Sequence, residues 1–587
     1  MNIELRRARN RQTFIFLLVS LGMLVMLSRL YYWQALQSNS GHNLAKLANQ
    51  EHIENQVLDA PRGLIYDAQN RILATNVVRD DVYIEPIQFA SEHPDKDLAQ
   101  SDLLNLIQSL NKVLPNVSLS QLKTDFALSS QTVRIAVKID PSQSQQLRTL
   151  HLPYTFLEPR TWRVYPSGDL ASQVLGYVTQ DENQNHGVYG IEGKYNSQLA
   201  GKPGSFIAET DLSGNPLVVG SSSQQAAVNG ANIQLTLDST IQYVVEQGLA
   251  DTVKQMEAQS GTVVVLNART GAIVAMAGAP SFDPNQYGQY ASDTGCLGTE
   301  QVYFNPALFC AYEPGSTLKA VTMAAALDQG LITPDTAIED PGYLSFDDAA
   351  TVNNWANLGY GHETMTQVLE HSANVGAAYV AHNVLGAKRY YPYLASFGFG
   401  SAMNLDGAEE AGGYRTPGTP NWSPTDLTRQ AFGQGILASP LQVARAYQAM
   451  ANGGVMMRPY LVSSITNNGQ TVVTHPTVDH RVISAKAAHL LTGMLEQAAT
   501  EGSAHAAKVL GYSFAAKTGT ATTQGISALQ TEASIAGYLP ASNPQFVILV
   551  KIDRPQASIY GGTAAAPLWK SIAQQLMWYY HVPPDEN

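Results

Sequence analysis

Three short segments of this 587-residue chain carry the functional groups that an acyl-transfer site needs. In the first, Ser316 and Lys319 are three positions apart, so on a helix the hydroxyl and the amine share one face. A serine hydroxyl is a weak nucleophile until a neighbouring base takes its proton, and a lysine that burial keeps neutral can be that base. Pro314 and Gly315 stand just before the pair, as expected at a sharp entry into a helix. The pattern predicts a nucleophilic serine in the first turn of a helix.

The second segment is Ser372-Ala373-Asn374. Residues i and i+2 point to the same side in an extended chain but not on a helix, so this spacing predicts an extended loop that lines a cleft. The hydroxyl of Ser372 can pass on a proton, and the amide of Asn374 can both donate and accept hydrogen bonds. Taken alone, the segment is equally compatible with an ordinary polar loop.

The third segment is Lys517-Thr518-Gly519-Thr520, and its apolar flank is typical of a strand. The charge of Lys517 and the hydroxyl of Thr518 can together hold a carboxylate. Gly519 has no side chain, which would let a substrate backbone approach closely. The main-chain N–H groups of Ser316 and Thr520 are candidates for an oxyanion hole that stabilises a tetrahedral intermediate.

The elements that must position these segments are predicted to be an antiparallel sheet with a helical lobe inserted into it. Apolar runs at 262–266 and 272–276 flank a turn and predict a hairpin. Further strands are expected near the C-terminus, so strands from both ends of this part would pair and a site would lie between the lobe and the sheet. These later elements are strands at 514–518, 534–538 and 546–552 and a helix at 568–580.

This sheet-and-lobe domain is expected to begin near residue 232, where Asp238 or Ser239 can cap a helix. The preceding part, up to residue 231, shows a mixed α and β pattern. Alternating apolar residues at 132–139 predict a half-buried strand. Leucine and isoleucine residues at helical spacing over 103–114 predict a helix, with Ser101 and Asp102 as its caps.

The N-terminal stretch that ends at Trp33 has the pattern of a membrane anchor. Residues 1–12 carry four arginines and one acid, and the mostly apolar stretch 13–33 is long enough to cross a bilayer. The arginines predict a cytoplasmic N-terminus, which places everything after Gln34 outside the cytoplasm. The alternative is a cleaved signal peptide, but the residues from Arg29 to Trp33 are bulky where a cleavage site needs small ones.

The composition argues against one class of function and does not decide whether the two cysteines form a disulfide. Charged residues make up only 14% of the chain and the formal net charge is -13, which is unlike a nucleic-acid-binding protein. Across 35–235, no group of His, Cys or acidic residues has metal-ligand spacing. Cys296 and Cys310 are fourteen positions apart, and two buried thiols or a disulfide in an oxidising compartment explain them equally well.

With the three segments in this order, the chain resembles the class B penicillin-binding proteins, the membrane-anchored D,D-transpeptidases of bacterial cell-wall synthesis. Residues 62–67 (Arg-Gly-Leu-Ile-Tyr-Asp) and 190–195 (Gly-Ile-Glu-Gly-Lys-Tyr) look like the family's pedestal motifs. Ala373 stands where the family often has serine, which removes no catalytic group. The resemblance implies an α+β multidomain fold with a cytoplasmic tail (1–12), a transmembrane helix (13–33), an elongated pedestal (34–231) and a transpeptidase domain (232–587).

Carried over to this chain, the resemblance implies a role for each residue of the three segments. Ser316 would attack the carbonyl between the two terminal D-alanines of a stem peptide, and Lys319 would take its proton. Ser372 and Lys517 would carry a proton to the leaving amine, while Asn374 orients Lys319 and the substrate. The terminal carboxylate would be bound by Thr518 and Lys517, and Gly519 and Thr520 of the same segment would also belong to the substrate-binding site.

The resemblance also implies the partners of the chain. β-Lactams would acylate the nucleophilic serine, no metal or organic cofactor would be needed, and a polytopic SEDS-family glycosyltransferase would contact the anchor and pedestal. Two other functions use the same serine or fold: a β-lactam sensor and a non-catalytic scaffold of the cell-wall machinery. A sensor would need several spans and a cytoplasmic effector, and a scaffold would not need all three segments intact. A class A β-lactamase is much shorter and has no anchor.

Overall fold

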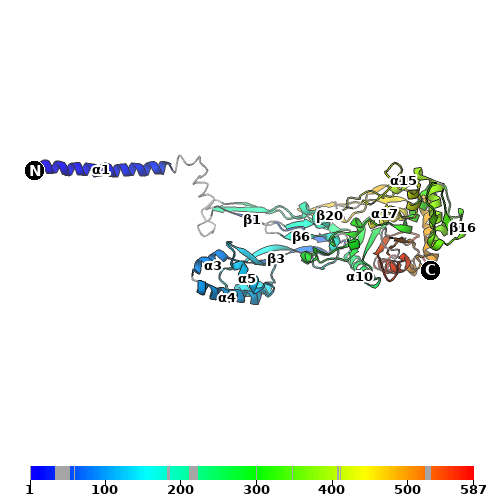
Figure 1. The fold of residues 1–587 in the computed structure, drawn as a ribbon, viewed down its shortest axis with the longest axis horizontal. Helices are drawn as coiled ribbons and strands as arrows, with labels where there is room; N and C mark the ends of the chain where they lie inside the picture. The colour runs from blue at the N-terminus through cyan, green and yellow to red at the C-terminus, as the bar shows by residue number, and fades with distance from the viewer. Residues whose placement is uncertain are drawn as a thin grey trace. The chain divides into compact units, whose positions relative to one another are not determined.

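The computed structural model describes residues 2–32, 53–58, 60–94, 96–180, 185–209, 222–298, 301–346, 348–405, 409, 411–522 and 530–586. Contacts between residues divide the chain, drawn in Figure 1, into two compact units. The first unit comprises Met1–Pro61 and Gly201–Asn229. The second comprises Arg62–Ala200 and Gly230–Asn587.

The first unit contains the predicted anchor. Helix α1 (Asn2–Tyr31) includes Arg9–Tyr31, with a mean hydropathy of 2.1, and within the described residues it is the one helix long and apolar enough to cross a membrane. Trp33, at the end of the predicted span, lies outside the described residues. The unit also has a three-stranded antiparallel sheet with strand order β1-β8-β9. These strands are β1 (Ile53–Leu58), β8 (Gly204–Glu209) and β9 (Ser222–Gln225).

In the second unit, a seven-stranded sheet joins the region before residue 200 to strands that follow residue 230. Its order is β21-β20-β10-β2-β3-β4, and β5 pairs with β3. The long strand β3 thus supports a small lobe whose helices bury their apolar faces in one cluster. The strands are β2 (Ile65–Tyr66), β3 (Ile72–Ile84), β4 (Val133–Ala136), β5 (Thr155–Val164), β10 (Asn232–Leu235), β20 (Val462–Asn467) and β21 (Gln470–Val473), and the lobe's helices are α3 (Pro86–Glu92), α4 (Lys96–Val113), α5 (Leu119–Phe126) and α6 (Pro141–Leu150).

Two predictions in this lobe need correction. Helix α4 begins at Lys96 rather than after Ser101 and Asp102, so those two residues lie inside it and do not cap it. The alternating stretch 132–139 forms a strand only over Val133–Ala136, because Lys138 has a left-handed φ of 52° that ends the extended run.

The two pedestal motifs of the sequence meet in a buried ion cluster. Arg62 Nε donates to Glu192 Oε2 and Arg163 Nε donates to Glu192 Oε1, each at 2.7 Å. All three side chains are at most 5% exposed. A carboxylate shared by two guanidinium groups is satisfied despite its burial, and removing Glu192 would leave two buried guanidinium charges without their shared partner.

The predicted sheet of the C-terminal domain is confirmed. Five antiparallel strands follow the order β12-β11-β25-β24-β23, so the first strands of the domain pair with the last. Among the strands that the structure describes, β23 lies at the edge of the sheet and pairs only with β24. The strands are β11 (Ser260–Asn267), β12 (Ile273–Ala279), β23 (Ala515–Thr522), β24 (Thr531–Leu539) and β25 (Phe546–Asp553).

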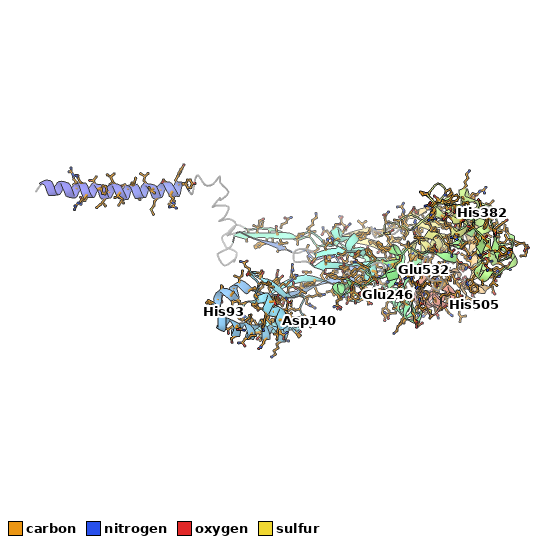
Figure 2. All side chains as sticks on the ribbon, in the orientation of Figure 1. His93, Asp140, Glu246, His382, His505 and Glu532 are labelled. Carbon is orange, nitrogen blue, oxygen red and sulfur yellow. A yellow bond between two sulfur atoms is a disulfide. The ribbon has the colours of Figure 1, made fainter. Side chains whose placement is uncertain are left out.

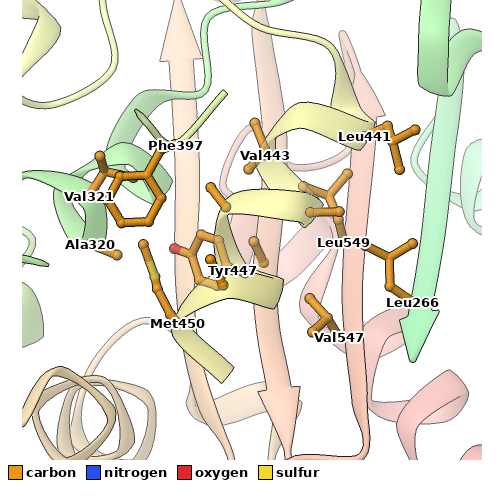
Figure 3. Close-up of a cluster of buried hydrophobic side chains, with 14 of the residues drawn as sticks. Leu266, Ala320, Val321, Phe397, Leu441, Val443, Tyr447, Met450, Val547 and Leu549 are labelled. Carbon is orange, nitrogen blue, oxygen red and sulfur yellow. The ribbon is translucent and has the colours of Figure 1, made fainter. Parts of the chain in front are cut away.

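Alternating side chains of this sheet fill two different cores. Val263 and Ile548 face helices α10 (Ser239–Gln255) and α20 (Ala566–Tyr579). Leu266 and Leu549 face α17 (Pro440–Ala451), which crosses the opposite face (Figure 3). The predicted cap is confirmed, because the Asp238 side chain accepts from the first N–H groups of α10.

The helical lobe inserted between these strands packs against the same face as α17. Its buried residues belong to the core that includes Val321 and Phe397, next to α17 in Figure 3. A short two-stranded ribbon, β13 (Ala337–Asp340) paired with β16 (Gly361–Thr364), lies within the lobe. The helices are α12 (Lys319–Asp328), α13 (Met365–Glu370), α14 (Asn374–Tyr379), α15 (Ala387–Ser396), α16 (Pro424–Gln430) and α18 (Ala485–Glu501).

The question of the cysteines is settled by their geometry. Cys296 and Cys310 are joined in a disulfide, with their Cα atoms 6.0 Å apart. The bridge closes the loop that leads into the segment of Ser316.

Candidate active site

The nucleophile candidate lies where the structure enters the helical lobe. Gly315–Leu318 form one 3₁₀ turn and α12 continues directly from Lys319, so Ser316 does open a helix, in a tighter turn than an α-helix has. Gly315 has φ +57°, and an added Cβ would lie 3.2 Å from the carbonyl of Thr520. Ser316 is partly exposed, whereas Lys319 is fully buried.

Lys319 brings the first two segments together. Its Nζ donates to Asn374 Oδ1 at 2.9 Å and to Ser372 Oγ at 3.3 Å, and it also contacts the Ser372 carbonyl. Burial, and after it the nearby charge of Lys517, holds the pKa of the Lys319 amine well below its usual range. This direction favours the neutral form that a general base requires.

The Ser316 hydroxyl is not hydrogen-bonded to Lys319 in this structure, nor to any other residue that the structure describes. Ser316 lies in the 3₁₀ turn and Lys319 at the start of α12, three positions further along the chain. Hydrogen bonds between catalytic groups are often long in a protein without substrate and become short only when substrate is bound.

The second segment is a turn between two helices, and the prediction of an extended loop was wrong. Ser372 has a left-handed φ of +59°, Ala373 is extended, and Asn374 is the first residue of α14. This left-handed residue, rather than an extended chain, brings Ser372 Oγ and Asn374 Oδ1 to the same amine.

The third segment lies on the edge strand β23, as predicted. Lys517 is 2% exposed, and burial lowers its pKa to about 7. Thr518 Oγ1 is hydrogen-bonded to Ser503 Oγ, and Thr520 Oγ1 accepts from the N–H of Gly561 at 3.2 Å. The Lys319 pKa is lowered by the charge of Lys517, so the two amines lie close enough to influence each other.

The reason predicted for Gly519 was incomplete. A Cβ at this position would lie 2.5 Å from Ser534 Oγ and 2.7 Å from the Pro314 carbonyl oxygen. The backbone that approaches Gly519 is therefore the protein's own turn before Ser316. The glycine lets the nucleophile turn pack directly on β23, which is how the first and third segments meet.

Several residues at this site belong to no sequence motif, so the sequence alone did not indicate them. Ser503 follows the end of α18 and contacts Thr518 only through the fold. Trp355 and Tyr560 form an edge-to-face pair with ring centroids 6.1 Å apart, although they are 67% and 43% exposed. The two aromatic residues come from distant parts of the chain, so no local pattern indicates the contact.

A groove of about 980 Å³ lies next to the residues that precede the nucleophile turn, and its lining residues do not include those of the predicted site: Ser316, Lys319, Ser372, Asn374, Lys517, Thr518 and Thr520. Tyr312 and Glu313, which precede the turn, form part of its wall. Charges of both signs line it, so the groove suits a polar peptide better than an apolar ligand. Its other charged lining residues are Arg415, Asp426, Arg429 and Glu532.

The titratable residues elsewhere do not gather into a metal centre. The histidines labelled in Figure 2, His93, His382 and His505, lie on different elements. Among the residues that the structure describes, no group of three or more His, Cys, Asp or Glu side chains could hold a metal ion.

Two family models match the chain. The model of the penicillin binding protein transpeptidase domain matches residues 261–575, and that of the penicillin-binding protein dimerisation domain matches residues 57–235. The first match alone covers more than half of the chain and includes all three segments.

Known proteins resemble the chain over almost its full length. It is 30% identical to penicillin-binding protein PbpB of Mycolicibacterium smegmatis, over 90% of this chain and 84% of that protein. It is 28% identical to the peptidoglycan D,D-transpeptidase FtsI of Escherichia coli, over 97% and 91%. Among solved structures, penicillin binding protein 3 of Mycobacterium tuberculosis, complexed with aztreonam, matches with a TM-score of 0.65, 27% identity and coverage of 90% and 98%. The chain therefore belongs to the penicillin-binding protein transpeptidase family.

Proposed function

We propose that this chain is a peptidoglycan D,D-transpeptidase that crosslinks stem peptides through a serine acyl-enzyme. One observation carries the proposal: the buried Lys319 amine, depressed in pKa, contacts both Ser372 and Asn374 and lies three residues from Ser316. The names of the relatives, FtsI among them, support the substrate class.

In the proposed first step, Ser316 Oγ attacks the carbonyl carbon between the two terminal D-alanines while the neutral Lys319 takes the hydroxyl proton. The main-chain N–H groups of Ser316 and Thr520 would stabilise the oxyanion. Packing of Gly315 against the Thr520 carbonyl supports this, because it brings the two segments side by side.

Collapse of the tetrahedral intermediate breaks the peptide C–N bond. Ser372 Oγ, which is 3.3 Å from Lys319 Nζ, would relay the proton to the leaving D-alanine amine. The ester on Ser316 is then attacked by an amine of a neighbouring stem peptide, which forms the new amide and restores the serine hydroxyl. The terminal carboxylate would be held beside the edge strand by Lys517, Thr518 and Thr520. Gly519 gives the turn before Ser316 room to pack on this strand.

The same chemistry makes the chain a target of β-lactams. The solved relative from Mycobacterium tuberculosis is described as complexed with aztreonam. A β-lactam would acylate Ser316 with opening of its four-membered ring, so no leaving group departs to make room for the acceptor amine.

We place the catalytic part outside the cytoplasm. Residues 13–33 would cross the membrane with the tail 1–12 on the cytoplasmic side, because the arginines precede the apolar stretch. The Cys296–Cys310 disulfide supports an oxidising location. Residues 34–231 would act as the pedestal that raises the transpeptidase domain (232–587), and a SEDS-family glycosyltransferase would be the partner at the anchor and pedestal.

A labelling experiment tests the proposal. Full-length protein in membranes should become covalently labelled by a fluorescent penicillin, and Ser316→Ala should abolish the label. Labelling that persists in Ser316→Ala would place the nucleophile elsewhere. A chain that is labelled but never consumes D-Ala-D-Ala stem peptides, alone or with its polymerase, would be a sensor or scaffold instead.

A further inference from the structure

The turn that carries Ser372 and Asn374 is strained and needs support from outside. Ser372 is not a glycine, yet it has a φ of +59°. Such a conformation costs free energy and persists only where surrounding contacts determine it. Both ends of the turn are in fact held by side-chain contacts with other segments.

Asn354 holds the end of the turn where α14 begins. Its Oδ1 accepts from the N–H of Asn374 at 2.8 Å and from the N–H of Val375 at 3.0 Å. A helix leaves its first N–H groups without partners, and the residue at the cap position, Ala373, has no side-chain oxygen to accept them. Asn354 therefore caps α14 from a separate segment of the chain, in place of the local cap that Ala373 does not supply.

The amide of Asn354 is itself fixed on its other side. Its Nδ2 donates to Asp340 Oδ2 at 2.7 Å and to the Leu358 carbonyl at 3.0 Å. Asn354 is 4% exposed and Asp340 is fully buried, and Asp340 Oδ1 accepts from the N–H of Gly342. Both amide hydrogens of Asn354 are donated and its Oδ1 accepts two hydrogen bonds. Only one orientation of the amide satisfies all four contacts.

His371 holds the other end, directly before Ser372. Its Nδ1 lies 3.1 Å from Glu363 Oε2, and its ring stacks on Tyr360 with centroids 4.3 Å apart. Asp340 pairs with Gly361 across the β13–β16 ribbon, so Asp340 and Glu363 project from the same face of it. One ribbon thus supports both ends of the turn.

We propose that Asn354 and His371 are positioning residues, through which the β13–β16 ribbon holds the Ser372–Asn374 turn against Lys319. Asn354 acts through Asn374, whose Oδ1 is 2.9 Å from Lys319 Nζ. His371 acts through Ser372. The inference rests on the acyl-transfer function proposed above.

The experiment measures the second-order rate constant for acylation of the full-length chain by a fluorescent penicillin, together with the melting temperature. Asn354→Ala should lower the rate constant by about 10- to 100-fold, since small displacements of catalytic groups have effects of this size. Asn357→Gly is the matched control in the same loop. Asn357 is exposed and has a φ of +53°, which glycine adopts freely. The acylation rate constant of Asn357→Gly should therefore stay within about 2-fold of wild type.

A double-mutant cycle separates positioning from general loss of stability. If Asn354 acts through Asn374, the double variant Asn354→Ala/Asn374→Ala should be acylated less than about 3-fold more slowly than Asn374→Ala alone. His371→Phe keeps a ring on Tyr360 but loses the Glu363 contact, and it should be non-additive with Ser372→Ala in the same way. Should Asn354→Ala not fold, the cycle is run with Asn354→Asp, which keeps the acceptor but places a second carboxylate beside Asp340.

Additive losses in these cycles, or a rate constant for Asn354→Ala equal to that of wild type, would overturn the inference while leaving the proposed function intact. A wild-type chain that is not acylated would overturn the proposed function and, with it, the inference.

Discussion

Lys319 Nζ and Asn374 Oδ1 lie 2.9 Å apart although 55 positions separate the two residues in the chain. The contact joins the first helix of the inserted lobe to the turn before α14. Because Lys319 is fully buried, this amide and the oxygens of Ser372 replace the water that would otherwise solvate the amine.

Replacing Lys319 should separate catalysis from stability. Lys319→Met removes a buried amine whose burial disfavours charge but leaves Asn374 Oδ1 and the Ser372 oxygens without their donor, so these effects oppose each other and the melting temperature should change little. Acylation by penicillin should slow by at least about 100-fold, since the general base is lost. Stopped-flow labelling and thermal unfolding measure the two effects. Acylation at the wild-type rate in Lys319→Met would show that another group takes the proton from Ser316.

Acylation should depend on pH through Lys517. Burial lowers its pKa to about 7, so above that pH the amine loses the charge that would attract a carboxylate. The acylation rate constant for a carboxylate-bearing penicillin should then fall, by at most about 10-fold per pH unit.

Lys517→Arg is the control for this dependence, because an arginine keeps its charge at every pH of interest. The fall above pH 7 should be absent in this variant, whatever its absolute rate. A fall that persists in Lys517→Arg would assign it to a different group.

Gly519→Ala tests how the nucleophile turn meets the sheet. The added methyl would lie 2.5 Å from Ser534 Oγ and 2.7 Å from the Pro314 carbonyl oxygen, so the turn must shift. We expect a loss of stability of about 1–3 kcal/mol, as for other overpacked sites, and slower acylation. Gly493→Ala is the control, because nothing lies within 4 Å of its Cβ position on helix α18. Equal behaviour of the two variants would contradict the packing described for Gly519.

Glu363 should make the stability of the chain depend on pH. Burial, and then the neighbouring Asp340, raises its pKa from the ordinary 4.5 to about 8. Between these values the folded chain keeps a proton that the unfolded chain has lost. The contribution to stability is therefore fully present below pH 4.5 and is lost as the pH rises to 8.

Glu363→Gln removes this titration. The melting temperature of the variant relative to wild type should accordingly be higher at pH 8.5 than at pH 5.5. A difference that does not change with pH would mean that Glu363 is ionised in the folded chain throughout this range.

The secondary-structure elements and the functional groups were predicted better from the sequence than the contacts between them. Continuous apolar runs were sufficient for β11 and β12, which pair as the predicted hairpin and fill one core or the other with successive side chains. The spacing of Ser316 and Lys319 was sufficient to predict that both lie at the start of a helix, because a helical turn is set locally. The family resemblance added the roles of the individual residues.

Other features depend on contacts that no local pattern contains. The left-handed φ of Ser372 is compensated by Asn354 and His371, and the need for glycine at position 519 comes from Pro314, in a distant part of the chain. Ser503 meets Thr518 only because α18 packs on β23. The start of α4 was misplaced because Ser101 and Asp102 are good cap residues, yet the helix already begins at Lys96.

The most direct test of the central claim is the mass of the intact chain after incubation with penicillin, followed by peptide mapping. The account predicts a mass increase of one penicillin molecule, located on the peptide that contains Ser316 and absent from Ser316→Ala. A chain that gains no mass, or that carries the adduct on a residue other than Ser316, would contradict it.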